Sequence, residues 1–364
     1  MLLRVAVLAA CVAAALGDSA DFNNTATANF KMWNDVLKTK NADGVAALYQ
    51  DTREGVTGIP ASWPLSFLSS LPVPTLSFLP TVSPEHIKGI PATKEYFVEF
   101  IKKNPSGFVT DESVQELTPM ADASAAYLHS GLYTFMTGYA DARVPVSARF
   151  SYVWQKVGVD QWKITHHHSS ALPVVSKRRA GTTDEAEAGW AESAAAGVFA
   201  PFIAAHRAEA AVPAATRRQQ QTGIDLAQAN FKIWNDKLQT KDPKQVAALY
   251  SDPRAGGELS FLPTAVPDHI KNIANTQGYF VEFTKKSPFG TITDDSVQMF
   301  NNNNAYLHSG MYTFAMGEVG ARTATKARFS YVWRKYGAEW KISHHHSSVL
   351  PGSKTEPIDK VDPS

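Results

Sequence analysis

The feature that most constrains the fold is a segment that occurs twice. Residues 162–173 read Trp-Lys-Ile-Thr-His-His-His-Ser-Ser-Ala-Leu-Pro, and residues 340–351 read Trp-Lys-Ile-Ser-His-His-His-Ser-Ser-Val-Leu-Pro. Shorter matches precede both copies in the same order, pairing residues 30–35 with 231–236, 45–49 with 246–250, 77–80 with 260–263, 96–100 with 279–283 and 127–131 with 306–310. A repeat of this length indicates duplicated domains, not a solenoid.

The repeat divides the chain into five parts. Residues 1–17 carry one arginine, an apolar run and small residues at the end, which predicts a cleaved signal peptide, with a buried N-terminal helix as the alternative. Two similar domains are expected at 22–173 and 223–351. The segment 174–222, rich in alanine, is expected to be a linker, and 352–364 a C-terminal tail.

Charge and cysteine content exclude several classes of protein. The 364 residues have a formal net charge of +1 and no sustained basic stripe, so we expect neither a nucleic-acid partner nor, after signal removal, a membrane partner. The single cysteine, Cys11, lies inside the predicted signal peptide. Disulfides and cysteine-bound metal are therefore not expected in the mature chain.

The order of apolar patterns predicts an α+β fold in each copy. Phe30, Trp33 and Leu37 form one helical face, a short helix follows a cap at Asn41 or Asp43, and a third helix carries Tyr96 to Ile101. Period-two patterns then predict strands over 108–117, 126–136, 146–157 and 161–170. N-terminal helices packed on a curved antiparallel sheet would give two tandem cone-shaped domains, each with a pocket between helices and sheet.

The histidine triplet does not suit a three-histidine zinc site. Side chains alternate along a strand, so we expect His167 to share one face with Thr165 and Ser169. The other face is expected to hold Trp162, Ile164, His166, His168 and Ser170. Adjacent histidines then point in opposite directions, and a site from His166 and His168 lacks an evident third ligand. We expect these two histidines to be packing or interface residues.

Three motifs together resemble the iota-class carbonic anhydrases of algae and bacteria. They are Tyr-Leu-His-Ser-Gly-x-Tyr-Thr-Phe, Ala-Arg-Phe-Ser-Tyr-Val-Trp and Trp-Lys-Ile-x-His-His-His-Ser-Ser-x-x-Pro, present in both copies. That class belongs to the association-domain branch of the nuclear-transport-factor-2-like superfamily and is related to the hub domain of calcium/calmodulin-dependent kinase II. The resemblance implies a polar pocket that binds bicarbonate and carbon dioxide.

The resemblance also implies site residues and cofactor use. Carried over by motif, the catalytic set is Thr134, Tyr152, His167 and Ser169 in the first copy, and Thr313, Tyr331, His345 and Ser347 in the second. No cofactor is expected, although a manganese requirement has been claimed for a diatom member and remains an alternative. Among the motif residues outside this set, we expect His129 and His308 to be structural. Arg149 and Arg328 could attract bicarbonate or form surface salt bridges.

These side chains suit the chemistry of carbon dioxide hydration. The reaction needs an oriented water, a proton acceptor, and donors where negative charge develops on oxygen. The hydroxyls of Thr134, Tyr152 and Ser169 would be such donors. A histidine, with a reference pKa near 6.5, would accept or relay the proton at His167. Without metal-activated water, we expect slower turnover than zinc enzymes reach.

Two other functions remain open from the sequence. The first is a noncatalytic assembly module, because related hub domains oligomerise through their sheets. The second is another small-pocket enzyme of the superfamily, such as a cyclase or isomerase, which would need an acidic base; the four motif positions contain no Asp or Glu. Tandem copies could pair within one chain as an internal dimer or form a homo-oligomer.

The expected location is the secretory pathway, with release from the cell or residence in the endomembrane lumen. The alternative is the plastid of a complex-plastid alga. Residues 197–201, Gly-Val-Phe-Ala-Pro, are reminiscent of algal plastid cleavage sites, but they lie inside the chain, where they cannot direct import.

Overall fold

The computed structural model describes residues 22–50, 76–139, 142–158, 161–173, 214–318 and 320–357. The predicted signal peptide at residues 1–17 and the segment 197–201 lie outside these residues. None of the helices in the described ranges combines the length and the apolar character needed to cross a lipid bilayer.

Each half of the chain begins with helices. The first half has a helix over residues 22–38 and then α2 (Ala42–Ala46), α4 (Ile90–Phe100) and the short 3₁₀ helix η1 (Ile101–Lys103). The second half has α5 (Ala214–Gln239), α6 (Pro243–Ala247), η4 (Pro253–Ala255), α7 (Ile273–Thr284) and η5 (Asn301–Asn303). Helix α5 begins at Ala214, inside the segment that the sequence predicts as linker, so that segment is helical at its end.

The helices form where the sequence predicts them because an apolar face and a capping side chain coincide. Phe30, Trp33 and Leu37 are all buried against the sheet. The side chain of Asn41 accepts a hydrogen bond from the backbone N–H of Gly44, which satisfies a free donor at the start of α2. Of the two caps considered, the structure therefore selects Asn41.

Each half also contains a β-sheet, with five strands in the first half and six in the second. The first contains β1 (Ser77–Leu79), β2 (Ser106–Thr118), β3 (Ala126–Thr137), β4 (Val144–Gly158) and β5 (Gln161–Ala171), in the order β1-β5-β4-β3-β2. The second contains β6 (Ser260–Leu262), β7 (Phe289–Phe300), β8 (Ala305–Met316), β9 (Thr323–Tyr336) and β10 (Glu339–Val349) in the equivalent order. These observations confirm the α+β class.

Two strands depart from the predicted antiparallel sheet and its boundaries. Strand β1 lies parallel to β5, with Phe78 opposite His167, because the chain crosses back through α4 before it enters the meander. Strand β11 (Glu356–Pro357) pairs with β9, so part of the predicted C-terminal tail belongs to the second sheet.

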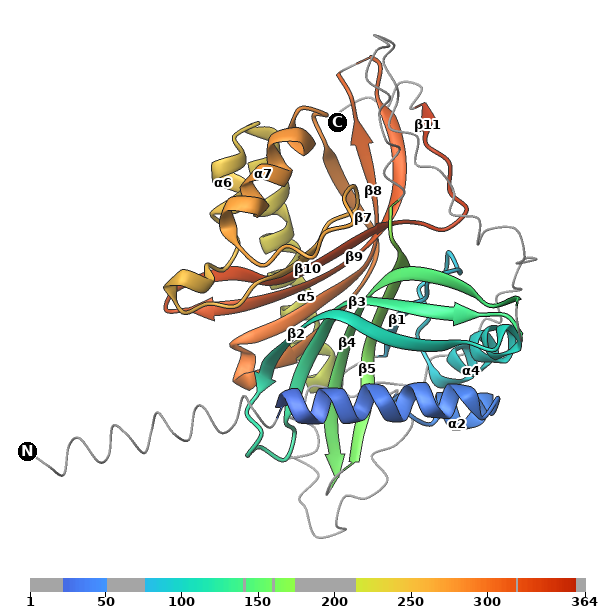
Figure 1. The fold of residues 1–364 in the computed structure, drawn as a ribbon. Helices are drawn as coiled ribbons and strands as arrows, with labels where there is room; N and C mark the ends of the chain where they lie inside the picture. Colours follow the sequence, from blue (N-terminus) through green and yellow to red (C-terminus); the bar gives the residue numbers. More distant parts are fainter. Residues whose placement is uncertain are drawn as a thin grey trace, which may run out of the picture.

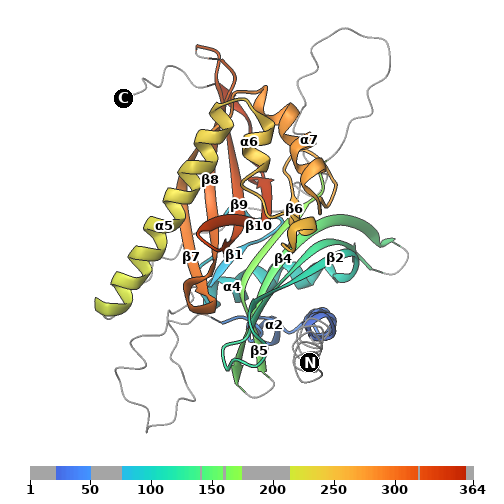
Figure 2. The same cartoon turned by 90° about the vertical axis from the view of Figure 1, so that its left-hand side faces the viewer.

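The helices and the other domain cover opposite faces of each sheet (Figures 1 and 2). One face packs against its own helices around a core rich in aromatic rings, including Trp33, Phe78 and Phe150. The opposite face packs against the other sheet. There, a third apolar cluster combines Leu117, Ala126, Leu128 and Val153 with Phe300, Ala305, Leu307 and Val332. The two copies thus form the expected internal pair.

Candidate functional site

A β-bulge places the first histidine triplet. His166 pairs with Val153 and Ile164 pairs with Trp154, which leaves Thr165 as an extra residue without a partner in β4. The extra residue resets the alternation, so Ile164 and His167 both face the helix-covered core. The expectation that Trp162 and Ile164 share a face with His166 and His168 is therefore wrong. Ser343 has the same place in the second copy.

The ring of His167 lies in an aromatic cage. It stacks on Phe78 with ring centroids 4.7 Å apart and lies 4.2 Å from the ring of Tyr152. Its Nδ1 atom is 2.8 Å from the hydroxyl of Tyr49, and that hydroxyl accepts a hydrogen bond of 3.2 Å from Nε1–H of Trp33. Two hydrogen bonds in series therefore fix the orientation of the imidazole.

This series also determines where the proton lies on the histidine. The indole of Trp33 can only donate, so the Tyr49 oxygen is the acceptor. The O–H of Tyr49 is satisfied only if it donates to Nδ1 of His167, and the neutral imidazole then carries its proton on Nε2. Burial, and secondarily the neighbouring His166, hold the pKa of His167 well below its usual range. His167 is thus a neutral Nε2–H donor.

Two buried polar atoms beside this cage have no hydrogen-bond partner among the described residues. They are the hydroxyl of Tyr152 and Nε2 of His167. Close by, the hydroxyl of Ser169 is hydrogen-bonded to both Tyr133 and Thr81. A buried polar group without a partner costs about 1–3 kcal/mol, so this arrangement is suited to a bound polar molecule or water.

The second domain repeats these features. Its unpartnered atoms are the hydroxyl of Tyr331 and Nε2 of His345. Nδ1 of His345 is 2.8 Å from the hydroxyl of Tyr250, and Ser347 is bonded to Tyr312 and Thr264. The predicted pairs of Tyr152 with His167 and Tyr331 with His345 are therefore brought together, each with the predicted serine nearby.

The predicted threonines do not join these groups. Thr134 lies between Tyr133 and Phe135, whose side chains are buried in the first core, so strand alternation places Thr134 on the opposite face. Thr313 has the same position between Tyr312 and Phe314. The hydroxyls that complete the two sites come instead from Tyr133 with Thr81 and from Tyr312 with Thr264. The tyrosines belong to a recognised motif, and the threonines directly follow the repeated Ser-Phe-Leu-Pro.

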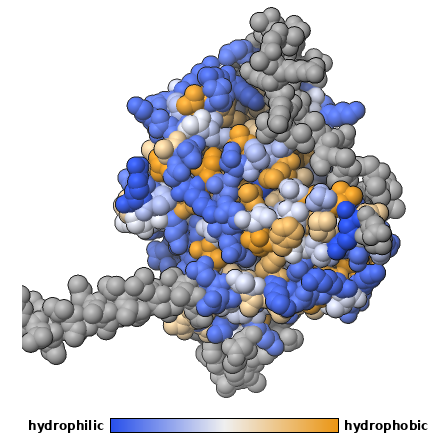
Figure 3. All heavy atoms as spheres, viewed as in Figure 1, coloured by the Kyte–Doolittle hydropathy of each residue, from blue (hydrophilic) through white to orange (hydrophobic). Residues whose placement is uncertain are grey.

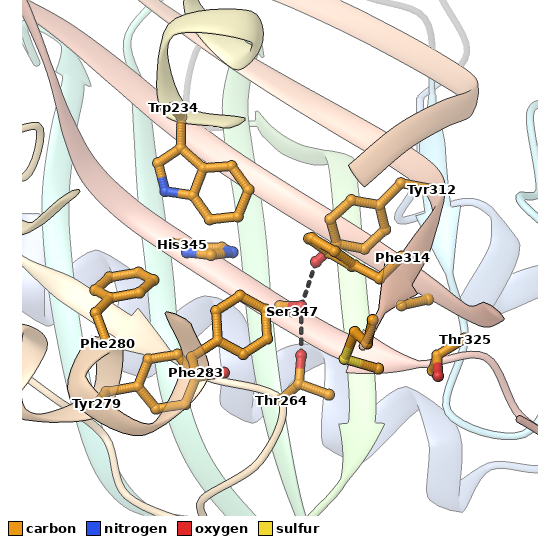
Figure 4. Close-up of a pocket in the computed structure, with 12 residues that line it drawn as sticks. Trp234, Thr264, Tyr279, Phe280, Phe283, Tyr312, Phe314, Thr325, His345 and Ser347 are labelled. Atoms are coloured by element: carbon orange, nitrogen blue, oxygen red, sulfur yellow. Dashed lines mark hydrogen bonds between the residues drawn. The ribbon is translucent and has the colours of Figure 1, made fainter. Parts of the chain in front are cut away.

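A small pocket opens at the site of the second domain (Figure 4). The cavity has a volume of about 20 Å³, counted as the space in which the centre of a water molecule can lie. A single water needs about 10–15 Å³ of such space. The wall is mostly aromatic, and Thr264, His345 and Ser347 supply polar groups. No Asp, Glu, Lys or Arg is among its lining residues. The pocket suits a molecule of a few heavy atoms.

The donors in these sites do not suit manganese. Among the described residues, no group of three or more His, Cys, Asp or Glu side chains is placed to hold a metal ion. Manganese favours carboxylate and carbonyl oxygens with water, whereas the pocket of the second domain offers one histidine and neutral hydroxyls.

The remaining histidines of the triplets join the two domains. Nδ1 and Nε2 of His168 each lie 2.9 Å from a serine of the second domain, Ser330 and Ser348. His346 makes the reciprocal pair of bonds to Ser151 and Ser170, also at 2.9 Å. The two imidazoles stack with their centroids 3.6 Å apart. The expectation of an interface role is confirmed.

A second set of interdomain bonds contains the residue types of a hydrolytic triad. Nδ1 of His86 is 2.8 Å from Asp294, and its Nε2 is 2.8 Å from the hydroxyl of Ser77. A nucleophile must be reachable, but Ser77 is fully buried and its hydroxyl also bonds Ser309. This set therefore joins the domains, as does its counterpart of Asp111, His269, Ser260 and Ser130.

The two arginines of the motif are buried, so the alternative of a surface salt bridge is wrong. Arg149 is 2% exposed and Arg328 is 1% exposed. Burial lowers the pKa of Arg149 to about 10 and that of Arg328 to about 9, so both remain charged at neutral pH. Both guanidiniums donate to serine hydroxyls and backbone carbonyls, and neither bonds a carboxylate of the described residues.

His129 and His308 occupy structural positions. His129 packs edge-on against Phe150 at 4.8 Å and bonds Glu112 at 2.7 Å. His308 makes the corresponding contacts with Phe329 at 4.9 Å and Asp295 at 3.1 Å. Both histidines link an edge strand to the core.

Known protein families account for this architecture. The family model described as the calcium/calmodulin-dependent protein kinase II association domain matches residues 70–173 and 226–351, more than half of the chain. The chain belongs to this family. The two sites described above lie one in each of two tandem association domains, and the pocket described above belongs to the second. A comparison with curated proteins found no match.

Solved structures with similarity to this chain include two crystal structures of proteins from Xanthomonas campestris and Novosphingobium aromaticivorans. A crystal structure titled as an association domain of this kinase type, from Xanthomonas campestris, is 27% identical and covers 42% of this chain and 100% of its own, with a TM-score of 0.32. A nuclear-transport-factor-2-like protein with a cystatin-like fold from Novosphingobium aromaticivorans is 12% identical and covers 38% of this chain and 89% of its own, at 0.30. Likenesses at such TM-scores identify no activity for this chain.

Proposed function

We propose that each association domain hydrates carbon dioxide reversibly to bicarbonate. The observation that carries this proposal is the pair of buried, unpartnered polar atoms in each domain, the Tyr152 hydroxyl with Nε2 of His167 and the Tyr331 hydroxyl with Nε2 of His345. Each pair lies beside a chain of three hydrogen-bonded hydroxyls, and in the second domain His345 and Ser347 line a pocket with room for only a few heavy atoms. Carbon dioxide and bicarbonate are of that size.

The donors would act on the charge that develops in the reaction. When water attacks carbon dioxide, a new C–O bond forms and one electron pair of a C=O bond moves onto oxygen. Nε2–H of His167 and the hydroxyl of Tyr152 can donate to that oxygen, and such preorganised donors stabilise the transition state. Because the aromatic wall excludes water, these hydrogen bonds are stronger than they would be in solution.

The hydroxyl chain would orient the water and carry its proton. Ser169 contacts both Tyr133 and Thr81, so its hydroxyl can accept a proton from the attacking water while it passes its own to Thr81. Thr81 is partly exposed, and its hydroxyl would release a proton to solvent water, which leaves bicarbonate in the site. His167 cannot begin this transfer through Nδ1, which is occupied by Tyr49. The proton acceptor is then a weak base, and we expect a rate enhancement well below that of zinc-bound hydroxide.

The test is stopped-flow hydration of carbon dioxide by chelator-treated, metal-analysed protein. The double variant Tyr152→Phe with Tyr331→Phe removes the two buried hydroxyls that have no partner among the described residues and should lose about 10²-fold or more in activity, which is typical for an oxyanion donor. Tyr139→Phe is the matched control, since that residue is exposed and its hydroxyl donates to the backbone carbonyl of Lys102 on the surface. Hydration by the wild type no faster than buffer, with or without manganese, would refute the proposal.

Assembly without catalysis is the second candidate, favoured by the family and by the interface. The sheet faces of the two domains already bind each other within the chain. Further association would need other surfaces, and the face in Figure 3 shows apolar patches separated by polar residues. A mass measurement by light scattering that gives multiples of the chain, together with absent hydration activity, would favour this function.

We further propose entry into the secretory pathway, on the pattern of residues 1–17. N-terminal sequencing of the protein from its native cells should begin near residue 18. Recovery of the protein from plastids would support the alternative location.

A further inference from the structure

The buried arginine of the second domain bonds to the first domain beside its pocket. Arg328 donates through one terminal nitrogen to the backbone carbonyl of Pro80 and through the other, at 3.3 Å, to the carbonyl of Ser169. Its Nε bonds the hydroxyl of Ser348 in its own domain at 3.2 Å. Pro80 directly precedes Thr81, so the guanidinium fixes both ends of the Thr81–Ser169 hydrogen bond.

The first domain has the reciprocal contact. Arg149 donates to the carbonyl of Pro263, which precedes Thr264 of the second pocket, while its Nε bonds Ser170 at 3.2 Å. The exchange is therefore symmetric: each arginine originates in one domain and binds the segment that carries the pocket threonine of the other.

The charge of each arginine also reaches the other domain's pocket. Burial raises the pKa of Tyr133 to about 12, and the charge of Arg328 opposes that rise. Burial likewise raises the pKa of Tyr279 in the second pocket, against the charge of Arg149. A positive charge in a low-dielectric surrounding acts over several ångströms.

An anion in these pockets needs such a charge. The lining of the second pocket contains no lysine or arginine, and its histidine is neutral because burial holds the pKa of His345 well below the usual range. Moving an anion from water into an aromatic cavity without a countercharge is strongly unfavourable. The guanidiniums of Arg149 and Arg328, which bond no carboxylate of the described residues, are buried charges that act on Tyr279 and Tyr133 of the two sites.

We propose that each pocket obtains its cationic residue from the other domain, so that Arg328 supports binding of a small monovalent oxyanion in the first pocket and Arg149 in the second. Both are positioning residues that act through the Thr81 and Thr264 segments and through their charge. The inference rests on the proposed function in taking bicarbonate as the natural anion.

The test observes the two pockets separately and without catalysis. The indole N–H of Trp33 is bonded to Tyr49, which holds His167, and Trp234 lines the second pocket. Their indole signals in ¹H–¹⁵N spectra of the full chain, assigned by Trp→Phe substitution, report one pocket each. Bicarbonate and the inert planar anion nitrate are titrated into wild type, Arg328→Met and Arg149→Met.

A crossed pattern is the expected result. Arg328→Met should weaken anion binding reported by Trp33 by about tenfold or more, the equivalent of one charge-assisted interaction, and leave binding at Trp234 unchanged. Arg149→Met should do the reverse. If either methionine variant unfolds, the corresponding Arg→Lys variant replaces it. In Arg328→Lys the charge remains, but lysine cannot bridge Pro80, Ser169 and Ser348. Anion binding reported by Trp33 should then weaken by less than the loss expected for Arg328→Met, and binding reported by Trp234 should stay unchanged.

Several outcomes would overturn the inference. They are an effect of each arginine on the pocket of its own domain, an equal effect on both pockets, and the failure of both anions to shift either indole signal of the wild type. Stopped-flow hydration by the same samples separates this inference from the proposed function. Hydration without an anion response would support the proposed function and contradict the role of the exchanged arginines. A crossed anion response without hydration would support the exchanged arginines and contradict the proposed function.

Discussion

We expect acid to unfold this protein at a pH above the range in which its exposed carboxylates take up protons. Burial lowers the pKa of His344 to about 3 and lowers that of the other five triplet histidines in the same direction. An unfolded histidine titrates near 6.5. Since the folded pKa is the lower one, the unfolded chain binds more protons below pH 6.5, and stability falls as pH falls through that window.

The size of the effect follows from the number of buried rings. Each pH unit below 6.5 costs about 1.4 kcal/mol per histidine until the folded pKa is reached. At pH 5 this amounts to about 2 kcal/mol for His344 alone. The other five triplet histidines, whose pKa values are lowered in the same direction, add to this loss. The whole stability of a domain is about 5–15 kcal/mol, so unfolding should begin between about pH 5 and 6.

Urea unfolding followed by tryptophan fluorescence between pH 7.5 and 4.5 measures this directly. The slope of unfolding free energy against pH gives the protons taken up. The variant His168→Gln with His346→Gln removes two of the six groups and should reduce that slope by about 2.7 kcal/mol per pH unit. Exposed paired carboxylates such as Asp35, whose pKa is held near 2 by Lys31 and Lys38, titrate below this window. An uptake of less than one proton between pH 6.5 and 5 would refute the reasoning.

Three further predictions concern the site and its sheet. The double variant Thr81→Val with Thr264→Val should reduce carbon dioxide hydration by about tenfold or more. The control Thr134→Val with Thr313→Val should leave the rate unchanged. A loss of activity in the control and none in the first variant would favour Thr134 and Thr313 as site residues. Tyr49→Phe removes the donor to Nδ1 of His167. The ¹⁵N shifts of the His167 imidazole should therefore change from those of the pure Nε2–H tautomer to those of a mixture of the two tautomers. An Nδ1–H tautomer in the wild type would contradict the proton placement. Gly131 has φ +157° and an added Cβ would overlap the carbonyl oxygen of Asp111, so Gly131→Ala should destabilise the fold by about 2 kcal/mol or more in thermal unfolding, while Gly278→Ala, which meets nothing within 4 Å, should not.

The sequence predicts most of the fold because its patterns are local. Alternating residues place strands β2 to β5 to within a few positions, and the caps and apolar faces place the helices. The same local reasoning fails at Thr165, because a bulge depends on pairing with β4 and leaves no mark in the residue types. Strict alternation carried across Thr165 therefore places Trp162 and Ile164 on the same face as His166, which is the wrong face.

The composition of the site is harder to predict because it depends on distant segments. Tyr152, His167 and Ser169 follow from their motifs, but Thr81 reaches Ser169 only through the parallel pairing of β1 with β5. Tyr133 and Thr134 are neighbours on one strand and must face opposite sides of the sheet. Because an aromatic side chain is more often buried than a threonine, alternation favours Tyr133 as the residue that faces the core and the site. The place of Arg149 depends on the other domain, which no pattern within one copy can reveal.

The covalent joining of the two copies has a further consequence. Separate subunits would pair only above some concentration, whereas two halves of one chain meet at an effective concentration set by the connecting segment, regardless of dilution. Joined halves can also diverge. At equivalent positions of the two sheets, the second pocket has Met316 and Thr325 where the first copy has Thr137 and Val146. A single gene can therefore hold two nonidentical pockets in a fixed ratio of one to one, a composition that a symmetric homodimer cannot reach.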